Sequence, residues 1–361
     1  MDELEINRKK IEEIDKQMAK LFEERMLSAK EIALYKKEKG LPIYDKTRED
    51  ALIKKNSNLV SDEVINEYYV QFLKGVINTS KEYQNRLISG VKVAYSGAEG
   101  AFAYIAAQKL FPNANHSAFS SFEDAYRAVE NGEFDYAILP IENSYAGDVG
   151  VVMDLMFSGS LYVNTVLELD VVHNLLIKND SSIDKIKYVV SHPQALEQCE
   201  NFIKEHGYEK ISYSNTALAA KYVSEQCDET YSAIGSVETA KAFNLKVVAS
   251  GINSAKNNTT RFAVFSRSQR LPLSTSKNEN ERFMLMFTAK NEAGSLAKAL
   301  DIIGAHNFNM RSLRSRPMKE LLWNYYFYVE AEGNVNTQNG KDMLRELSAL
   351  CARLKLVGAY N

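Results

Sequence analysis

The first forty residues restrict the fold more than any other part of the chain. Residues 3–39 contain neither glycine nor proline, and the first break is the Gly-Leu-Pro turn at 40–42. As a single helix this segment spans roughly 55 Å, which is too long for a lone compact domain, so a partner helix is expected. Residues 1–88 contain one proline and, before position 75, one glycine, which predicts an all-helical head.

Charged side chains interrupt the apolar stripe of this predicted helix. Alternating steps of four and three residues give Leu4, Arg8, Ile11, Asp15, Met18, Phe22, Arg25, Ala29, Ile32 and Lys36. Three cations and one anion thus occupy positions where a helix–helix seam is normally apolar. Burying such a charge is costly unless an opposite charge meets it. Either these charges are solvated on a drifting helix, or they line a pocket for a ligand with several negative charges. Three cations in one seam favour the pocket.

Composition excludes several classes of protein. With 361 residues the chain should form two or three domains, and 45% apolar and 25% charged residues are typical of a soluble globular protein. The net charge of -3, without a Lys/Arg block, argues against nucleic acid and anionic membranes as partners. No apolar run approaches a membrane span and the N-terminus is charged, so a cytoplasmic location is expected. Neither a disulfide framework nor a metal or cofactor site is expected from five histidines and three scattered cysteines: Cys199, Cys227 and Cys351.

From residue 91 the pattern changes to short β-branched runs that alternate with amphipathic stretches. Strands are predicted at 91–95, 136–139, 163–172, 188–191 and 233–234, and helices at 101–110, 121–131, 194–205 and 216–225. This alternation predicts an α/β region at 91–267. A polar stretch at 268–281 suits a linker. Residues 282–361 fit a strand–helix–strand–strand–helix–strand order, which predicts a small ferredoxin-like unit.

Three spacings in the helical head are specific: R-(x6)-D-(x9)-R-(x10)-K, P-(x2)-D-(x2)-R-E and S-(x3)-Q. Together they resemble the all-helical chorismate mutase family over its full length. In that family two long helices pair between protomers and each active site borrows one arginine, so the resemblance implies an intertwined homodimer. It implies Arg8 as the borrowed arginine, and Lys36 and Gln84 as donors to the ether oxygen. The other implied contacts to chorismate are Arg25, Asp45, Arg48, Glu49 and Ser80. Taken alone, without the resemblance, Ser80 is better interpreted as a polar helix end.

The implied reaction explains these residue types. Chorismate is a dianion that rearranges to prephenate by a pericyclic path, so no nucleophile, general base or cofactor is needed. Arginines can hold the carboxylates in a bidentate manner. A preorganised donor at the breaking C–O bond typically contributes about 2.7–4 kcal/mol.

Four polar motifs mark the α/β region: YSGAEGAF at 95–102, PIENS at 140–144, SHPQALEQC at 191–199 and NNTTRF at 257–262. In order and spacing, and with the HNLL segment that begins at His173, they resemble the prephenate dehydratase family. The resemblance implies two α/β lobes around a cleft, like a periplasmic amino-acid-binding protein. It implies substrate contacts from one lobe (Glu142, Asn143, Ser144), from the other (Ser191, Gln194, Gln198) and from the hinge or cleft (Thr260, Arg261, Phe262).

The implied dehydratase reaction removes CO2 and water from prephenate. Thr260 is then expected to hydrogen-bond to the departing hydroxyl, since a threonine is a poor acid in water. Arg261 either holds a carboxylate or forms a structural ion pair. The glycine loop departs from the family pattern, because Ala98, Ala101 and Ala103 stand where hydroxyl residues are usual. In this loop, only the backbone N–H groups of Gly97 and Gly100 could then donate hydrogen bonds to the substrate.

The C-terminal segments 290–300 and 313–317 resemble the two signature segments of ACT domains attached to prephenate dehydratases. This implies that L-phenylalanine binds between two such domains and inhibits the dehydratase. The implied effector residues are Asn291, Gly294, Ser295, Leu296, Ser315, Arg316 and Pro317. The chain departs from the usual Glu-Ser-Arg-Pro, since Arg314 replaces the glutamate. Trp323 and Tyr325 are expected in the core or an interface.

The function expected from these motifs is a bifunctional enzyme of phenylalanine biosynthesis, with an isomerase head and a lyase centre. Two alternatives remain open at the level of sequence. One is a non-catalytic amino-acid sensor, against which the full set of charges in the head and the lack of an export signal argue. The other is a single-activity enzyme with one degenerate catalytic domain.

Overall fold

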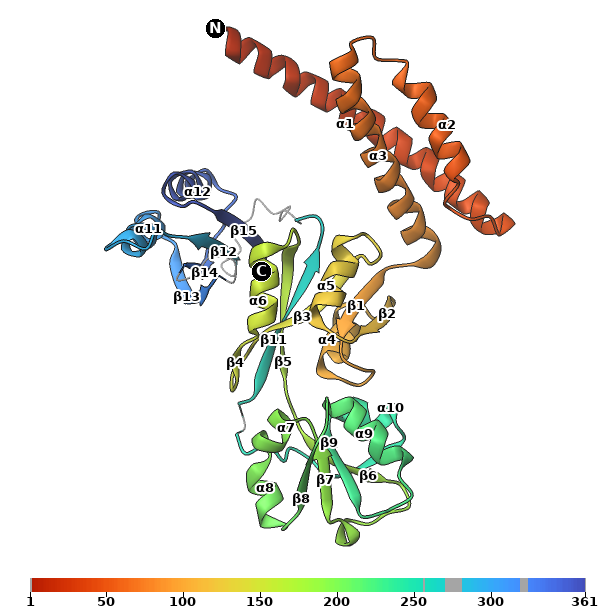
Figure 1. Cartoon of the computed structure of the whole chain (residues 1–361), viewed down its shortest axis with the longest axis vertical. Helices are drawn as coiled ribbons and strands as arrows, with labels where there is room; N and C mark the ends of the chain where they lie inside the picture. The colour runs from red at the N-terminus through yellow and green to blue at the C-terminus, as the bar shows by residue number, and fades with distance from the viewer. Residues whose placement is uncertain (1, 256, 270–280, 319–323, 361) are drawn as a thin grey trace. The chain divides into compact units, whose positions relative to one another are not determined.

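The computed structural model describes residues 2–255, 257–269, 281–318 and 324–360. Most of the predicted linker (270–280) and Trp323 therefore lie outside the described residues. The chain divides into two compact units, Met1–Lys92 and Val93–Asn361 (Figure 1). Among the described residues, no helix combines the length and the apolar character needed to cross a membrane.

The first unit is helical, as predicted. It consists of α1 (Glu3–Lys39), α2 (Lys46–Ser57) and α3 (Glu63–Ser89). An aspartate caps the N-terminus of each helix by accepting a backbone N–H: Asp2, Asp45 and Asp62. The long helix α1 ends where Gly40 takes the left-handed conformation, with φ 64°, that favours glycine.

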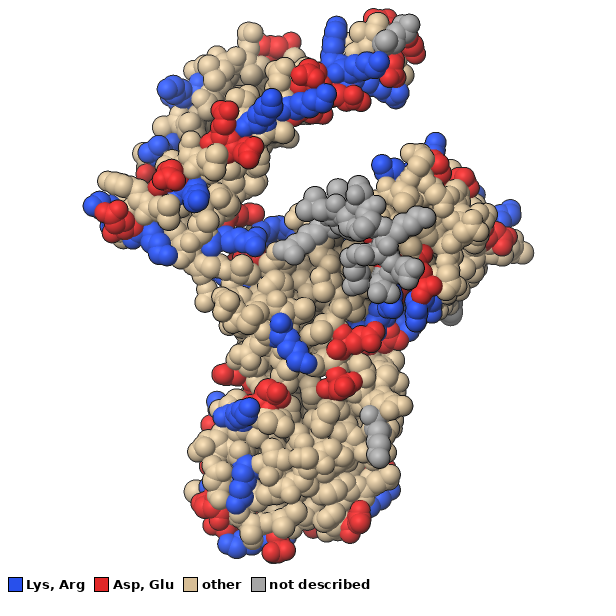
Figure 2. Space-filling model, turned by 180° about the vertical axis from the view of Figure 1, so that it is seen from behind, with Lys and Arg blue, Asp and Glu red and all other residues tan. Residues whose placement is uncertain are grey.

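The apolar stripe of α1 is only partly covered within one copy of the chain. The buried residues of α1 are Ala29 and Ala33, both in its C-terminal half. The large apolar side chains of its first half are all exposed: Leu4, Ile11, Ile14, Met18, Leu21 and Phe22. On the face shown in Figure 2, Lys and Arg side chains alternate with Asp and Glu along this unit. A face of this size that remains apolar in a surface of mixed charge is typical of a protein interface.

The second unit begins with an α/β lobe. Its strands are β1 (Lys92–Ser96), β2 (Asn115–Phe119), β3 (Tyr136–Asn143), β4 (Gly147–Asp148), β5 (Tyr162–Asp170) and β11 (Thr259–Ser266). Its helices are α4 (Phe102–Leu110), α5 (Phe122–Glu130) and α6 (Gly150–Ser158). The central strand β11 is antiparallel to both β3 and β5. The largest fully buried side chains of its core include Tyr126, Met153, Met156 and Phe265.

The chain leaves this lobe after β5, forms a second lobe, and returns through β11. The second sheet has the order β10-β6-β9-β7-β8. Its strands are β6 (Asn174–Lys178), β7 (Tyr188–Ser191), β8 (Glu209–Ser212), β9 (Tyr231–Gly235) and β10 (Leu245–Ala249). Helices cover both faces (Figure 1): η1 (Ile183–Lys185), α7 (Pro193–Gln198), α8 (Glu200–Glu205), α9 (Thr216–Glu225) and α10 (Val237–Ala242). Neighbouring residues such as Val189 and Val190 enter different cores, as expected for a strand buried on both faces.

The C-terminal part has the predicted strand and helix order. It consists of β12 (Arg282–Thr288), α11 (Ser295–Ala305), β13 (Asn309–Pro317), β14 (Tyr325–Glu332), α12 (Gln338–Leu350) and β15 (Leu354–Tyr360). Its four strands join the first lobe in one sheet, since β15 pairs with β5 at Gly358 and Val163. A Cβ on Gly358 would lie 1.9 Å from the carbonyl oxygen of Val163, so only glycine fits. Met284 and Tyr328 also enter the core of the lobe.

Candidate active sites

A cavity of about 350 Å³ lies between the three helices of the first unit. All of the predicted mutase residues except Arg8 line it: Arg25, Lys36, Asp45, Arg48, Glu49, Ser80 and Gln84. They come from the second half of α1, the start of α2 and the end of α3. The turn at 40–42 reverses the chain, and α1 and α2 both pack against α3. The polar residues that were spread over sixty positions of sequence therefore share one cavity.

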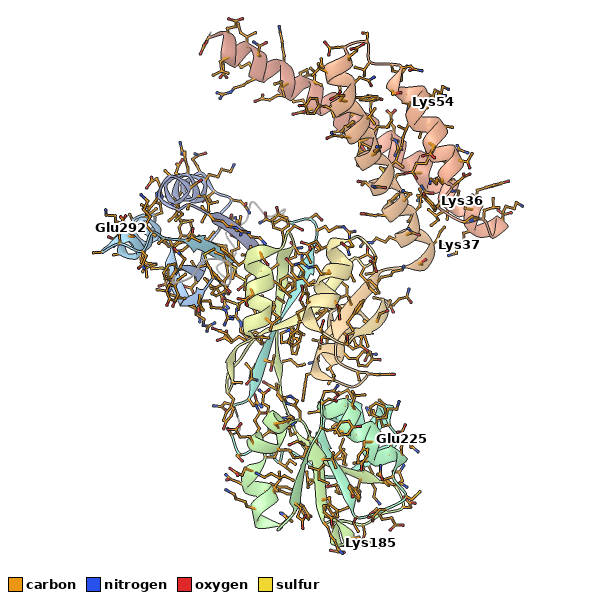
Figure 3. The ribbon with its side chains drawn as sticks, in the orientation of Figure 1. Lys36, Lys37, Lys54, Lys185, Glu225 and Glu292 are labelled. Atoms are coloured by element: carbon orange, nitrogen blue, oxygen red, sulfur yellow. The ribbon has the colours of Figure 1, made fainter. Side chains whose placement is uncertain are left out.

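The cationic and amide groups of this cavity are partly held in place. Lys36, near the C-terminal end of α1 (Figure 3), donates to the carbonyl oxygen of Ile43 at 2.7 Å. Arg25 Nη1 and Gln84 Oε1 are buried and lack a hydrogen-bond partner among the described residues. Because unpaired buried polar groups are costly, such atoms often mark a ligand site.

Arg8 is exposed in the N-terminal part of α1 and does not line this cavity. Lys81 also lines the cavity, although no motif predicted it. Lys81 Nζ lies 2.9 Å from Glu49 Oε2 and 5.1 Å from the centroid of the Tyr44 ring. Its position four residues after Ile77 and three before Gln84 was the signal that could have found it.

A second cavity, of about 570 Å³, lies between the two α/β lobes. Of the predicted dehydratase residues, Asn143, Thr260 and Phe262 line it from the first lobe, and Gln194 and Gln198 from the second. Six further polar residues, which were not predicted as site residues, also line it: Ser96, Asp148, His173, His192, Asn215 and Thr216. Aromatic rings at Phe102, Phe122 and Phe262 complete the wall.

The side-chain amide of Asn143 orients the hydroxyl of Thr260. Asn143 Oδ1 accepts the backbone N–H groups of Tyr145 at 3.0 Å and Ala146 at 2.9 Å, which fixes the orientation of the amide. Its Nδ2 therefore donates to Thr260 Oγ1, at 2.9 Å, and to Asn258 Oδ1, at 2.8 Å. Since the Thr260 oxygen accepts this bond, its own proton is available to donate into the cavity.

The network continues into the second lobe through Gln198. Its Oε1 accepts from Asn258 Nδ2 at 2.9 Å and lies 2.9 Å from His173 Nε2. An oxygen that accepts both bonds requires the His173 proton on Nε2, and leaves the buried Nδ1 without a partner among the described residues. Burial lowers the pKa of His173, although the bond to Gln198 opposes this. His173 is thus neutral near pH 7.

Four predicted substrate contacts lie outside this cavity, for reasons of strand geometry. Glu142 and Arg261 face away from it because side chains alternate along β3 and β11. Ser144 Oγ donates to the carbonyl oxygen of Asn257 at 2.8 Å and holds the start of β11. Ser191 is buried, and its hydroxyl donates to the carbonyl oxygen of Ile234 at 3.0 Å.

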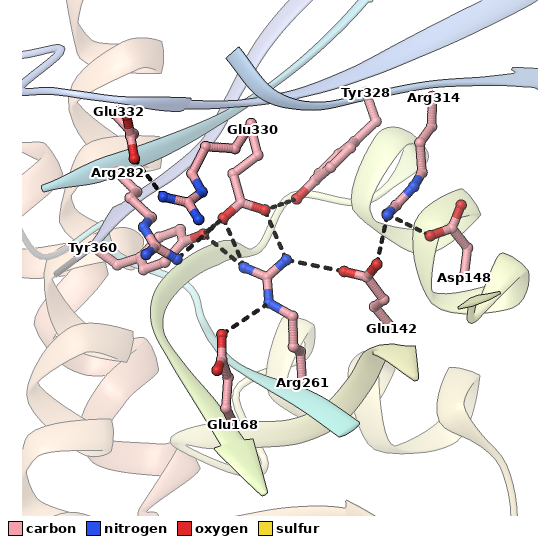
Figure 4. A network of polar contacts seen from close by, with 11 residues as sticks. Glu142, Asp148, Glu168, Arg261, Arg282, Arg314, Tyr328, Glu330, Glu332 and Tyr360 are labelled. Carbon is pink, nitrogen blue, oxygen red and sulfur yellow. Dashed lines mark hydrogen bonds and ion pairs between the residues drawn. The ribbon is translucent and has the colours of Figure 1, made fainter. Parts of the chain in front are cut away.

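Of the two roles considered for Arg261, a substrate contact or a structural ion pair, the structure shows the ion pair (Figure 4). Its guanidinium bonds Glu330 at 2.7 and 2.8 Å, Glu142 at 3.0 Å and Tyr360 Oη at 3.2 Å. Burial alone would raise the pKa of Glu330, but hydrogen bonds from Arg261 and Tyr360 hold it below its ordinary value. These contacts fasten β14 and β15 to the first lobe and leave Arg261 no free donor pair for a substrate.

The glycine loop before α4 also has a structural role. The N–H of Gly97 donates to the carbonyl oxygen of Phe119 at 3.0 Å, so it is not a free anion donor. The carbonyl oxygen of Gly100 accepts from Thr239 Oγ1 at 2.7 Å and from Ser236 Oγ at 3.1 Å. The loop therefore joins the first lobe to the N-terminus of α10.

The predicted effector residues fall on two elements of the C-terminal part. Asn291 and Gly294 are exposed in the turn before α11, Ser295 begins that helix, and Leu296 packs against its core. Ser315, Arg316 and Pro317 end β13. Arg316 Nε lies 3.2 Å from Asp154 Oδ1 in α6, and Pro317 lines a cavity of about 190 Å³ beside that helix.

Comparison with known proteins assigns a family to the helical unit and to the two α/β lobes. Residues 7–85 match the family described as chorismate mutase type II, and residues 93–270 match the prephenate dehydratase family. A bifunctional chorismate mutase/prephenate dehydratase of Buchnera aphidicola is 31% identical over 370 residues, covering 98% of this chain and 95% of the relative.

Two solved structures resemble about three quarters of the chain. The prephenate dehydratase of Arthrobacter aurescens, in complex with L-Phe, has a TM-score of 0.69 at 24% identity and covers 75% of this chain and 89% of that one. GqqA, described as a novel type of quorum quenching acylase, has a TM-score of 0.68 at 27% identity and covers 74% of this chain and 97% of that one. The fold alone thus does not decide the chemistry, but the full-length match does decide the family: the chain belongs to the bifunctional chorismate mutase/prephenate dehydratases.

Proposed function

We propose that this chain converts chorismate to prephenate in the cavity of the helical unit and prephenate to phenylpyruvate between the two lobes. The observation that carries this proposal is the contrast between the two cavities. One gathers cations and amides, and the other places an oriented hydroxyl beside side-chain amides and aromatic rings. Each arrangement suits one of two consecutive reactions.

In the helical unit, Arg25 and Arg48 would hold the two carboxylates of chorismate. Lys36 and Gln84 would stabilise the charge that develops on the ether oxygen as the C–O bond breaks. Holding the compact conformer of the substrate supplies the remaining part of the rate enhancement. No proton transfer is required, so a cavity of cations and amides is sufficient for this reaction.

In the α/β unit, the ring hydroxyl of prephenate would lie against Thr260. The Thr260 hydroxyl would donate a hydrogen bond to the departing hydroxide. At the same time CO2 would leave from the ring carbon opposite the hydroxyl, and the ring would become aromatic. Phe102 and Phe262 would face the forming phenyl ring. Gln194 and the start of α9, at Thr216, offer neutral and backbone donors to the carboxylates.

The C-terminal part would act as a ferredoxin-like ACT domain that binds L-phenylalanine. Strand β13 lies at one edge of the sheet, and no strand of the described residues pairs with its outer side. A second copy of the chain could therefore pair there. The exposed apolar face of α1 supports a homodimer as well, with Arg8 entering the cavity of the partner. The cytoplasmic location expected from the sequence stays a prediction.

Inhibition by phenylalanine can be tested on the full chain. Deletion of residues 282–361 would uncover the core shared with the first lobe, so a point variant is the better probe. Ser295→Glu would place a carboxylate where that of the ligand is expected, and Lys298→Ala changes an exposed residue of the same helix. Phenylalanine should inhibit the dehydratase of the wild type and of Lys298→Ala, by a factor within about 5–150. Equal inhibition in Ser295→Glu would argue against this site.

Chorismate and prephenate supplied separately to the purified protein test the two activities. We expect both substrates to be consumed. Consumption of neither would indicate an amino-acid sensor, and consumption of only one would indicate that one catalytic unit is degenerate.

A further inference from the structure

The dehydratase cavity has an unusual charge balance for its proposed substrate. Prephenate carries two carboxylates, yet the described residues that line the cavity include no lysine or arginine, and Asp148 adds a carboxylate to the wall. An unpaired carboxylate there would repel the substrate. The inference below rests on the proposed function, because it concerns how this dianion is tolerated.

Asp148 lies on the short strand β4, directly opposite Glu142 on β3. Two like charges at opposite positions of an antiparallel pair destabilise the hairpin unless a cation lies between them. The same hairpin supplies Asn143, Gly147 and Val149 to the cavity wall. Its geometry therefore matters to the hydrogen bond between Asn143 and Thr260.

The cation comes from the C-terminal part of the chain. Arg314, on β13, lies with Nη1 2.5 Å from Asp148 Oδ1 and with Nη2 2.5 Å from Glu142 Oε1 (Figure 4). All three side chains are largely covered, at 27%, 24% and 24% exposure. Arg316 approaches the same segment, since a Cβ on Gly150 would lie 2.7 Å from its guanidinium.

We propose that Arg314 is a positioning residue of the dehydratase: it neutralises Asp148 beside the substrate and holds the β3–β4 hairpin against the C-terminal part. Burial raises the pKa of Asp148, and the cations of Arg314 and Arg316 oppose this rise while Glu142 adds to it. The departure of Arg314 from the usual glutamate is then explained by its partners. A glutamate at 314 would add a third carboxylate to the pair Glu142 and Asp148.

Steady-state kinetics on supplied prephenate test this role in the full-length protein. Arg314→Gln should raise KM by about tenfold or more, because it exposes the substrate to an unpaired charge at short range. The effect on kcat should be smaller. Arg314→Lys should recover part of the loss. Arg311→Gln is the matched control, because Arg311 lies on the same strand but pairs with Glu332 within the C-terminal part.

A second substitution separates charge from support of the fold. In the double variant Arg314→Gln/Asp148→Asn the repelling charge is gone, so KM should return most of the way toward the wild-type value. No recovery, or a KM of Arg314→Gln equal to that of Arg311→Gln, would overturn the proposal. The chorismate mutase activity of each variant reports whether the purified chain is intact. A wild-type chain that does not consume prephenate would refute the proposed function instead.

Discussion

Asn143 Nδ2 donates a 2.9 Å hydrogen bond to Thr260 Oγ1 across the antiparallel strands β3 and β11, where the two residues are direct partners. The bond fixes the direction of the Thr260 hydroxyl, because its oxygen is occupied as an acceptor and its proton must be donated elsewhere. Thr260 faces the cavity between the lobes. The pair thus combines an oriented hydroxyl with the place where the leaving group of prephenate is expected.

Removal of this hydroxyl should affect turnover more than binding. Thr260→Ala should lower the kcat for prephenate by about a hundredfold or more, the lower range for a lost proton donor, with a much smaller change in KM. Thr260→Ser retains the hydroxyl and should preserve most of the activity. An unchanged kcat with a raised KM would make Thr260 a binding residue.

The adjacent residues Lys36 and Lys37 provide a test variant and its control for the mutase (Figure 3). Lys36 lines the cavity of the helical unit, whereas Lys37 is exposed and does not line it. Lys36→Ala should lower mutase kcat by about a hundredfold or more, since a preorganised donor is lost. Lys37→Ala should leave it near the wild-type value. Dehydratase activity on supplied prephenate should persist in both, and its loss in a folded Lys36→Ala protein would exclude separate sites.

The predicted dimer can be tested by complementation. If Arg8 enters the cavity of the partner, Arg8→Ala and Lys36→Ala chains are each inactive as mutases, but a mixed dimer contains one cavity with both wild-type residues. Mixing the two variants should then restore part of the activity. Absence of recovery, once subunit exchange has been demonstrated by a tag on one variant, would indicate that each cavity is completed within its own chain.

Glu330 should contribute stability that depends on pH. Its pKa is lowered from 4.5, so its stabilising effect is present above pH 4.5 and is lost as the pH falls through the folded-state value. Glu330→Gln should lower the free energy of unfolding at pH 7 by about 3 kcal/mol, which is the lower end of the range for breaking a buried ion pair. The lower end is expected because Glu142 still contacts Arg261 in this variant. Chemical denaturation should show this difference shrinking below pH 4.5. Glu332 lies on the same strand but is far less buried than Glu330, so Glu332→Gln should lower the free energy of unfolding much less. An equal loss in both variants would contradict the role of Glu330.

Local patterns predicted the helical head well. The lack of glycine and proline up to residue 40 gave α1, and the charge spacing gave the residues that share its cavity. The predicted helix at 194–205 is two helices in the structure, α7 and α8, separated at Cys199. Strand β2, which is short and half exposed, was not predicted, because a run such as Asn115–Phe119 carries little periodic signal.

The dehydratase site shows where motifs reach their limit. Adjacent residues of one motif were assigned together, yet strand alternation sends Asn143 and Thr260 into the cavity and Glu142 and Arg261 away from it. The contribution of Asp148 could not be recognised either, since its partner Arg314 lies far along the chain. Long-range ion pairs of this kind depend on sheet topology, which local patterns do not contain.

One assay addresses the central claim that a single chain carries out both steps. Chorismate alone is supplied to the purified protein, and samples are quenched without acid, because acid itself converts prephenate to phenylpyruvate. We expect prephenate to appear first and phenylpyruvate to follow. In Thr260→Ala, prephenate should accumulate, and in Lys36→Ala, chorismate should persist. If phenylpyruvate forms only after acid treatment of the wild-type reaction, or if chorismate remains unchanged, the chain does not carry out both steps.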